Sequence, residues 1–336
     1  MPTACLNQAR LSIHLRSERL IVRGPNPDGG KHDTELREIP LRDLDRVIAL
    51  EGVQFSSEAL AALLRAEIPI SLLGWQGQFL GSFQPVINQH GFARLQQYRR
   101  SQDDASALRL AGRIVAAKIY NQRRVIQRLA ANRTQDHAAG LLRLEQMLQS
   151  AGHCQSLDEL RGCEGAASAR YFELWAGFLP PAFPFERRSR RPPHNAVNAC
   201  ISFGSTLLYQ EMTAALHAQG LDPALGLLHV TENGRWSLSL DLMEPFRPVL
   251  VEALALDLFT HQILNASHFE PQNGGIYLNQ DGRAKFFLQY ERRMERQFMA
   301  ESVGHRTTLR QQLEAQAVFA KSSLDDPDKF QPFLMN

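Results

Sequence analysis

The stretch Arg187–Pro248 begins with the basic and proline-rich sequence RRSRRPPHN at Arg187–Asn195. An apolar segment follows it, and the stretch closes with SLDLMEPFRP at Ser239–Pro248. His229 lies between these two parts, and the closing motif carries two acids, Asp241 and Glu244, three positions apart. Because cations, a histidine and paired acids are set here in apolar sequence, the stretch indicates a metal site that binds phosphate.

The composition of the chain is that of a globular protein, with 336 residues of which 44% are apolar and 21% charged. This length predicts two domains. No uncharged apolar run is long enough for a membrane span, and the N-terminus does not resemble a signal peptide. The four cysteines lack paired spacing, which favours reduced thiols in a cytoplasm. Since the net charge is only +2, any affinity for nucleic acid must come from local clusters.

Residues 1–90 predict a small β-rich domain for folding or assembly, because they contain no cluster of histidines and acids. Strand patterns occur at Leu11–Leu15, Arg19–Val22, Thr34–Ile39, Asp45–Leu50 and Ile68–Leu73, with turn sequences at Pro25–Gly30 and Gln76-Gly77. Ser56 or Ser57 can cap a short helix that places Leu60, Leu63 and Leu64 on one face. Pro69 argues that its strand lies at a sheet edge.

Residues 91–336 predict a larger, all-helical domain, so the fold class is α+β. A long helix is expected over Asp103–Ala131, with the apolar stripe Leu108, Ala111, Ile114 or Val115, Ile119, Val125 and Ile126. Basic residues fill other positions of this region: Arg99, Arg100, Arg109, Arg113, Lys118, Arg123, Arg124, Arg128 and Arg133. They fit either a solvated helix face or a phosphate-contacting surface. Charge alone does not decide between the two.

Glu164 falls at an expected helix start among very small residues. A glutamate in a first turn is favoured by the helix dipole, and that is one interpretation. The other is a metal ligand, which needs partners from elsewhere in the chain.

The basic run Arg187–Arg191 lies beside two prolines and is expected to form an ordered loop. Four arginines in five positions repel one another unless an anion joins them, so both a solvated loop and phosphate recognition are open. Asn195 or Asn198 can cap the helix that follows, and Gly220-Leu221-Asp222-Pro223 is typical of its end.

A β-hairpin is predicted around Asn233-Gly234, which would place His229 opposite Leu238. Asp241 and Glu244 would then begin a helix led by a proline, on one face. They fit either a capping box or metal ligands, and a lone histidine is often a core residue. Histidine with carboxylates suits a hard divalent ion, Mg²⁺ or Mn²⁺, rather than a closed zinc site.

The chain resembles the CRISPR-associated spacer integrases, the universal first core protein family of those systems, over almost its whole length. The motifs that carry the resemblance are Arg37–Leu41, Gly52–Ser56, Ile68–Ser71, Gln97–Arg99, Ala117–Arg123, Glu164-Gly165, Ala169–Phe172, Arg190–Asn198, Ser202–Gly204, Leu207–Tyr209, Gly220–Pro223, Leu228-His229, Ser239–Pro248, Tyr290–Arg293, Leu313–Leu324 and Gln331–Phe333. One departure lies inside the best motif, where Asn195 replaces the aspartate of many relatives. Asparagine can still cap the helix.

The resemblance implies an N-terminal β domain, a helical catalytic domain and a homodimer, with a small second core protein bridging two dimers. It implies a metal-dependent DNA endonuclease and integrase, in which the 3′-hydroxyl of a prespacer attacks a repeat-boundary phosphodiester in double-stranded DNA. The family's ligands for Mg²⁺ or Mn²⁺ fall on Glu164, His229 and Glu244, and Asp241 matches a further acid of the catalytic set.

Seven arginines are candidate DNA contacts: Arg170, Arg187, Arg188, Arg190, Arg191, Arg235 and Arg247. The alternative function is a catalytically silent DNA-binding scaffold of the same fold. In that protein the acids would be helix caps and the arginines would carry the function.

Overall fold

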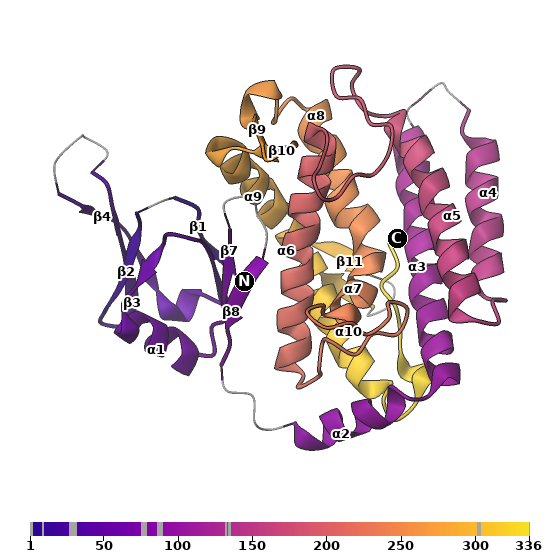
Figure 1. The fold of residues 1–336 in the computed structure, drawn as a ribbon, viewed down its shortest axis with the longest axis horizontal. Coiled ribbons are helices and arrows are strands. Elements are labelled where there is room, and N and C mark those ends of the chain that lie inside the picture. Colours follow the sequence, from indigo (N-terminus) through magenta and orange to yellow (C-terminus); the bar gives the residue numbers. More distant parts are fainter. Residues whose placement is uncertain are drawn as a thin grey trace. The chain divides into compact units, whose positions relative to one another are not determined.

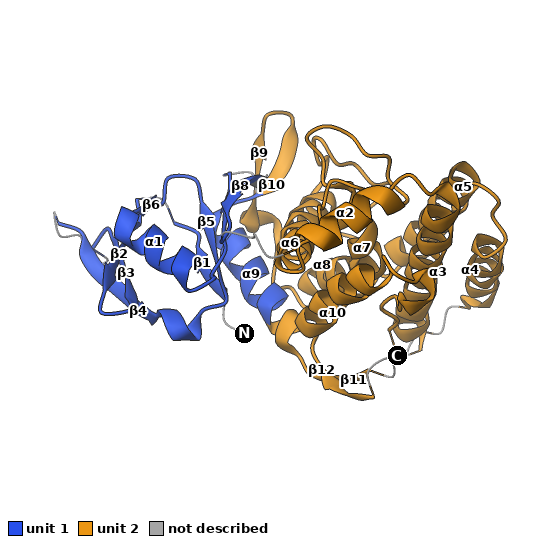
Figure 2. Cartoon of the chain, turned by 90° about the horizontal axis from the view of Figure 1, so that it is seen from below, with its two compact units in different colours: residues 1–87, 278–291 blue, residues 88–277, 292–336 orange. Residues whose placement is uncertain are grey.

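The computed structural model describes residues 3–8, 10–26, 32–74, 79–85, 90–131, 133, 136–300 and 304–335. The chain divides into two compact units, Met1–Ile87 with Leu278–Glu291, and Asn88–Tyr277 with Arg292–Asn336 (Figure 2). The sequence expectation placed the boundary at residues 90 and 91 and all of residues 278–291 in the second part. Among the described residues, no helix is long and apolar enough to cross a membrane.

The first unit contains two four-stranded sheets and one helix, α1 (Ser57–Arg65). One sheet has the order β4 (Thr34–Pro40), β3 (Arg19–Gly24), β2 (Ser12–Arg16), β6 (Gln54–Phe55). The other has the order β1 (Thr3–Leu6), β5 (Arg46–Leu50), β7 (Ile70–Leu73), β8 (Phe79–Phe83). Buried side chains of both sheets and of α1 form one core, including Ile13, Leu20, Val47, Leu63 and Ile70.

Strand patterns in the sequence predicted five of these strands, and Ser56 caps α1 by accepting the Ala59 amide at 3.2 Å. The edge position expected from Pro69 is wrong, because β7 pairs with β5 and β8. Pro69 precedes the strand, so its missing N–H interrupts no ladder bond, and its carbonyl accepts the Val47 amide at 2.9 Å. The turns expected at Pro25–Gly30 and Gln76-Gly77 fall largely outside the described residues.

The second unit is mainly helical (Figure 1). Its helices are α2 (Gly91–Arg100), α3 (Asp104–Ala130), α4 (Ala138–Ala151), α5 (Leu157–Ala176), α6 (Ala196–Ala218), α7 (Ser237–Met243), α8 (Ala253–Thr260) and α10 (Leu309–Ser322). Helix α9 (Gln280–Glu295) runs across the division between the units. Two short hairpins, β9–β10 (Phe269–Gln272, Gly275–Leu278) and β11–β12 (Phe298–Ala300, His305–Thr307), qualify the all-helical expectation. Short 3₁₀ turns also form at η4 (Ala266–His268) and η5 (Pro327–Lys329) in this unit, and at η1 (Leu41–Asp43) in the first unit.

Helix α3 matches its sequence prediction almost to the residue. Asp103 caps it by accepting the Ser106 amide at 3.1 Å, and the predicted stripe is buried at Ile114, Val115 and Ile119. Helices α4 and α5 pack beside α3 and beside each other (Figure 1). Helix α3 also contacts the 3₁₀ turn η2 (Glu244–Phe246), and this contact matters for the site.

The hairpin predicted around Asn233-Gly234 is wrong, although the turn itself forms, with Gly234 at φ +76°. Residues 227–230 are not a strand, and α7 begins at Ser237 where the second strand was expected. His229 therefore does not face Leu238 across a ladder. The backbone N–H groups that a strand would have paired are bonded to the carboxylate of Asp241 instead.

The capping-box expectation for Asp241 and Glu244 is also wrong. Asp241 lies inside α7, and Glu244 begins η2, which continues into the π-helical turn η3 (Arg247–Glu252) and then α8. Pro245 and Pro248 have no N–H to give to the preceding turn, so the helical path tightens and then widens instead of following regular α geometry. This irregular passage places the Glu244 side chain against α3.

Candidate metal centre

Asp241 organises the loop that carries His229. Its carboxylate is fully buried and accepts the amides of Leu227, Leu228 and His229 at 2.5, 3.1 and 3.0 Å. It also accepts Nδ1–H of His229 at 2.6 Å. Since Nδ1 is held in this way, the other ring nitrogen, Nε2, is left to act as a ligand.

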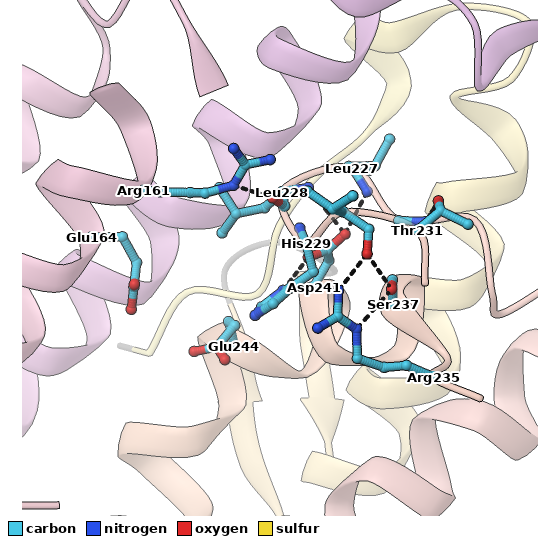
Figure 3. A network of polar contacts seen from close by, with 12 residues as sticks. Arg161, Glu164, Leu227, Leu228, His229, Thr231, Arg235, Ser237, Asp241 and Glu244 are labelled. Carbon is cyan, nitrogen blue, oxygen red and sulfur yellow. Dashed lines mark hydrogen bonds and ion pairs between the residues drawn. The ribbon is translucent and has the colours of Figure 1, made fainter. Parts of the chain in front are cut away.

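The loop is clamped from two further sides. Arg161, one helical turn before Glu164 on α5, donates its Nε–H to the Leu228 carbonyl at 2.8 Å (Figure 3). Gly226 permits the close passage of the chain, because a Cβ there would lie 2.2 Å from the carbonyl oxygen of His229. The position of the imidazole is therefore determined by α5 and α7 together.

Glu164 lies in the middle of α5, not at a helix start, so its first-turn interpretation is wrong. The helix begins at Leu157, and Ser156 is its cap, accepting the Glu159 amide at 3.2 Å. Oε1 of Glu164 accepts the hydroxyl of Ser168 at 2.9 Å, and Gln122 of α3 donates to that same hydroxyl at 3.3 Å. The glutamate is thus oriented by its own helix and by α3.

Glu244 is nearly buried, with a side chain 7% exposed, and it is paired with Arg247 at 3.0 and 3.2 Å. Burial alone would raise the pKa of the Glu244 carboxyl. The charges of Arg247 and Lys118 outweigh burial and hold this pKa well below its usual range. The carboxylate is therefore ionised at every physiological pH.

The side chains of Glu164, His229 and Glu244 turn toward one shared space (Figure 3). They come from α5, the 227–229 loop and η2, which are far apart in the sequence. Only the resemblance to the family indicated that these three residues act together. Within the described residues, no three His, Cys, Asp or Glu side chains are arranged to hold a metal ion as they stand.

Lys118 of α3 is the residue that sequence reasoning missed. Its ammonium contacts Oε1 of Glu164 and Oε2 of Glu244, and its side chain is only 5% exposed. The signal was present: position 118 is four residues beyond Ile114 and three beyond Val115, on the buried stripe. Burial lowers the pKa of Lys118, but the two carboxylates outweigh it, and the net shift is upward.

The residue types fit a divalent ion. The carboxylates of Glu164 and Glu244 already share one cation, the ammonium of Lys118. Histidine ligands of metals commonly donate their other ring N–H to a carboxylate, as Nδ1–H of His229 does to Asp241. Glu164, His229 and Glu244 would be the ligands, while Asp241, saturated by four donors, orients the histidine.

Two other basic residues of α3, Arg113 and Arg123, fit neither of the two interpretations drawn from the sequence. Arg113 donates to the carbonyls of Pro327, Asp328 and Phe330 at 3.0–3.1 Å, and Arg123 pairs with Glu145 at 2.9 Å. These cations secure neighbouring segments of the unit. They are neither a purely solvated face nor a free phosphate surface.

The basic run at Arg187–Arg191 is an ordered loop, as predicted, and Asn198 holds it. Oδ1 of Asn198 accepts Nη1–H of Arg188 at 2.7 Å and the Ser189 amide at 3.0 Å, while its Nδ2 donates to the Arg187 carbonyl at 3.0 Å. Asn195 caps α6 by accepting the Asn198 amide at 2.8 Å. The helix ends at Ala218, with Gly220 at φ +73°, as the sequence predicted.

Two of the seven candidate DNA contacts, Arg247 and Arg188, bond other residues of the protein. Arg247 has a side chain 7% exposed and is bonded to Glu244 and Glu252, so it is not offered to a ligand. Arg188 points inward to Asn198 and Ser202, and burial, with the charge of Arg247, lowers its pKa to about 9.

The remaining five candidates differ in exposure and in their bonds to other residues of the protein. Arg187, Arg190 and Arg191 are exposed. Arg170 pairs with Glu173 at 2.7 Å, and Arg235 pairs with Glu232 at 3.0 Å and bonds Ser237 and the Val230 carbonyl. The exposed cations of the loop are thus the strongest candidates for phosphate contact.

Comparison with known proteins places the chain in a family. Residues 5–292 match the family model described as "CRISPR associated protein Cas1". The chain belongs to this family.

Three similar proteins illustrate the relationship. A CRISPR-associated exonuclease Cas4/endonuclease Cas1 fusion of Geobacter sulfurreducens is 34% identical over 321 residues, which are 91% of this chain and 57% of that protein. The structure of a CAS1 protein from Thermotoga maritima superimposes with a TM-score of 0.79 and 25% identity, covering all of both chains. A chain of a Cas6-RT-Cas1–Cas2 complex gives a TM-score of 0.81 and 25% identity over all of this chain and 36% of that one. The chain therefore spans a little over half of the curated fusion relative.

Proposed function

We propose that this protein is a divalent-metal-dependent DNA endonuclease and integrase that inserts prespacer DNA into CRISPR repeats. The observation that carries the proposal is the convergence of Glu164, His229 and Glu244, with Nδ1 of His229 held by the buried Asp241. Family membership and the endonuclease name of the similar fusion protein support it.

A bound Mg²⁺ or Mn²⁺ would supply Lewis-acid polarisation of a phosphodiester and stabilise the charge that develops on it. The chain's own residues prepare this chemistry. Asp241 keeps the proton of His229 on Nδ1, so that Nε2 presents a lone pair to the site. Ser168 and Arg247 orient the two carboxylates before any ligand arrives.

The substrate in this proposal is double-stranded DNA, both the prespacer and the repeat. Arg187, Arg190 and Arg191, exposed on a loop that Asn198 fixes, would neutralise backbone phosphates. The attacking group is the 3′-hydroxyl of the prespacer, and the bond broken is the phosphodiester at the repeat boundary.

Assembly and location complete the proposal. We expect a homodimer and a small second core protein that bridges two dimers, and the Cas6-RT-Cas1–Cas2 complex with a similar chain supports that partnership. No disulfide links the four cysteines, all of which are described, and this fits the reducing cytoplasm.

The test is an integration assay with labelled prespacer and a plasmid that carries a repeat. Products joined to the plasmid are expected with Mn²⁺ or Mg²⁺ and the small partner, and none is expected in EDTA. The silent scaffold remains the alternative function. DNA binding without joined products, under every metal condition, would establish the scaffold and overturn the enzyme.

A further inference from the structure

Lys118 occupies the point where the two carboxylates of the site meet. Its ammonium contacts Oε1 of Glu164 from α5 and Oε2 of Glu244 from η2, and its side chain is 5% exposed. An ammonium has three donors and no lone pair, so it cannot become a metal ligand while it is charged. A divalent ion bound to both carboxylates would lie beside this ammonium, and the two cations would repel each other.

Both carboxylates also accept donors other than Lys118. Oε1 of Glu244 accepts Nη1–H of Arg247 at 3.0 Å, and Oε1 of Glu164 also receives the Ser168 hydroxyl at 2.9 Å. No ready-made group of three ligands exists among the described residues, although the correct residue types converge. Among the protein's own cations at this site, Lys118 is the one that contacts both Glu164 and Glu244 in the described structure.

We propose that Lys118 is a resident cation that stands in for the divalent ion, and that metal binding displaces its ammonium from between Glu164 and Glu244. This inference rests on the proposed function, because it concerns the same metal site. In the metal-free protein the positive charge of Lys118 reduces the repulsion between the two carboxylates. In the metal-bound protein the ion takes over that role, and the ammonium has to leave.

Displacement does not dismantle the site, because its other supports do not pass through Lys118. Glu244 keeps Arg247, Glu164 keeps Ser168, and His229 keeps Asp241. Lys118 therefore lowers the affinity for the ion without providing the geometry of the ligands. A repulsive cation at contact distance from the ion's position is expected to cost at least a factor of about ten in affinity.

The test is Mn²⁺ binding to the full chain without DNA, measured by titration calorimetry or electron paramagnetic resonance. Lys118→Met removes the charge and nearly keeps the volume, and we expect it to bind Mn²⁺ about tenfold more tightly than wild type. Lys118→Arg keeps a cation and is expected to bind no more tightly than wild type. Unchanged or weaker binding by Lys118→Met would overturn the proposal and make the lysine a support of the ligands.

Thermal unfolding separates this role from an ordinary packing role. In EDTA, Lys118→Met is expected to melt below wild type, because Glu164 and Glu244 lose their shared cation. Saturating Mn²⁺ is expected to remove that deficit. A deficit of the same size with and without Mn²⁺ contradicts the proposal. Lys118→Gln provides the same comparison if the methionine variant does not fold.

His229→Ala distinguishes failure of this inference from failure of the metal site itself. If that variant still binds Mn²⁺ as wild type does, the proposed ligand set is wrong whatever Lys118 does. If His229→Ala loses Mn²⁺ and Lys118→Met fails to gain affinity, the ligand set stands and only the displacement is wrong.

Discussion

Asp241 binds His229 twice, accepting its backbone N–H at 3.0 Å and its Nδ1–H at 2.6 Å. The aspartate lies in α7 and is fully buried, while the histidine lies in a loop twelve residues earlier. One carboxylate therefore determines both the path of the loop and the direction of the ring. This explains why an acid stands beside the site without having to be a ligand.

Asp241→Asn is expected to weaken both the loop and the metal site. The amide keeps one acceptor oxygen where the carboxylate accepts four hydrogen bonds, so the free energy of unfolding should fall by about 2–4 kcal/mol. Loss of the outer partner of a histidine ligand should weaken Mn²⁺ binding about 10–100-fold. Denaturant unfolding and Mn²⁺ titration measure the two effects.

Glu270→Gln is the control, because this acid is exposed on β9 and its substitution removes the same kind of charge. It should leave both quantities within experimental error. Wild-type Mn²⁺ affinity in Asp241→Asn would show that the ring needs no such partner.

Arg190→Ala with Arg191→Ala is expected to weaken duplex DNA binding and to flatten its salt dependence. Each lost phosphate contact should reduce the slope of log K against log salt concentration by about 0.9, so the pair should reduce it by roughly 2. The measurement is fluorescence anisotropy over a range of salt concentrations. A slope equal to that of wild type removes these residues from the DNA interface.

Arg188→Ala tests the opposite role within the same loop. Arg188 bonds Asn198 and Ser202 internally, so its loss should destabilise the unit by about 1–3 kcal/mol and leave the salt slope almost unchanged. A reduced slope with unchanged stability would mean that this arginine turns outward to phosphate.

The stability of the metal-free protein should depend on pH through His229. Burial lowers the pKa of the ring, but the hydrogen bond and the charge of Asp241, with Glu244, outweigh it and raise the net value. A folded-state pKa above the unfolded one stabilises the protein below about pH 6.5. That contribution is lost as pH rises through the folded-state pKa.

Melting curves in EDTA from pH 5.5 to 9 check this linkage. The advantage of wild type over His229→Asn should be largest at the acid end and should shrink as pH rises. An advantage that grows with pH would reverse the sign and contradict the raised pKa.

Asn121→Ala should destabilise the helical unit strongly. Its buried side chain donates to the carbonyls of Pro245 and Phe333 at 2.7 and 3.0 Å and accepts the Met335 amide at 2.7 Å. Truncation removes three hydrogen bonds to backbone groups and should cost about 2–4 kcal/mol in chemical denaturation. Gln127→Ala, on the same helix, is the control, and equal effects of the two would contradict this account.

Local patterns predicted the regular elements well. Alternation predicted the strand around Ile13, apolar runs predicted those around Leu20 and Val47, and the 3.6-residue stripe predicted α3 nearly to its ends. The apolar residues of these elements are buried, and their order can be read directly from the sequence. The cap of α6 at Asn195 was also local and was also predicted.

The environment of the site could not be predicted in the same way. The Asn233-Gly234 turn formed, yet no hairpin followed, because the amides of residues 227–229 bind a carboxylate that comes later in the chain. Likewise, the place of Lys118 on the buried stripe indicates that it is buried, but it does not identify Glu164 and Glu244 as its partners. Both outcomes depend on contacts between distant segments.

The most direct test of the account compares strand transfer and duplex binding in one set of proteins. Wild type, Glu164→Gln, His229→Ala and Glu244→Gln are incubated with Mn²⁺, labelled prespacer and repeat DNA, with Glu270→Gln as the control. The account predicts that the three site variants lose strand transfer while they still bind the duplex and remain folded. Strand transfer at the wild-type rate by His229→Ala would contradict it.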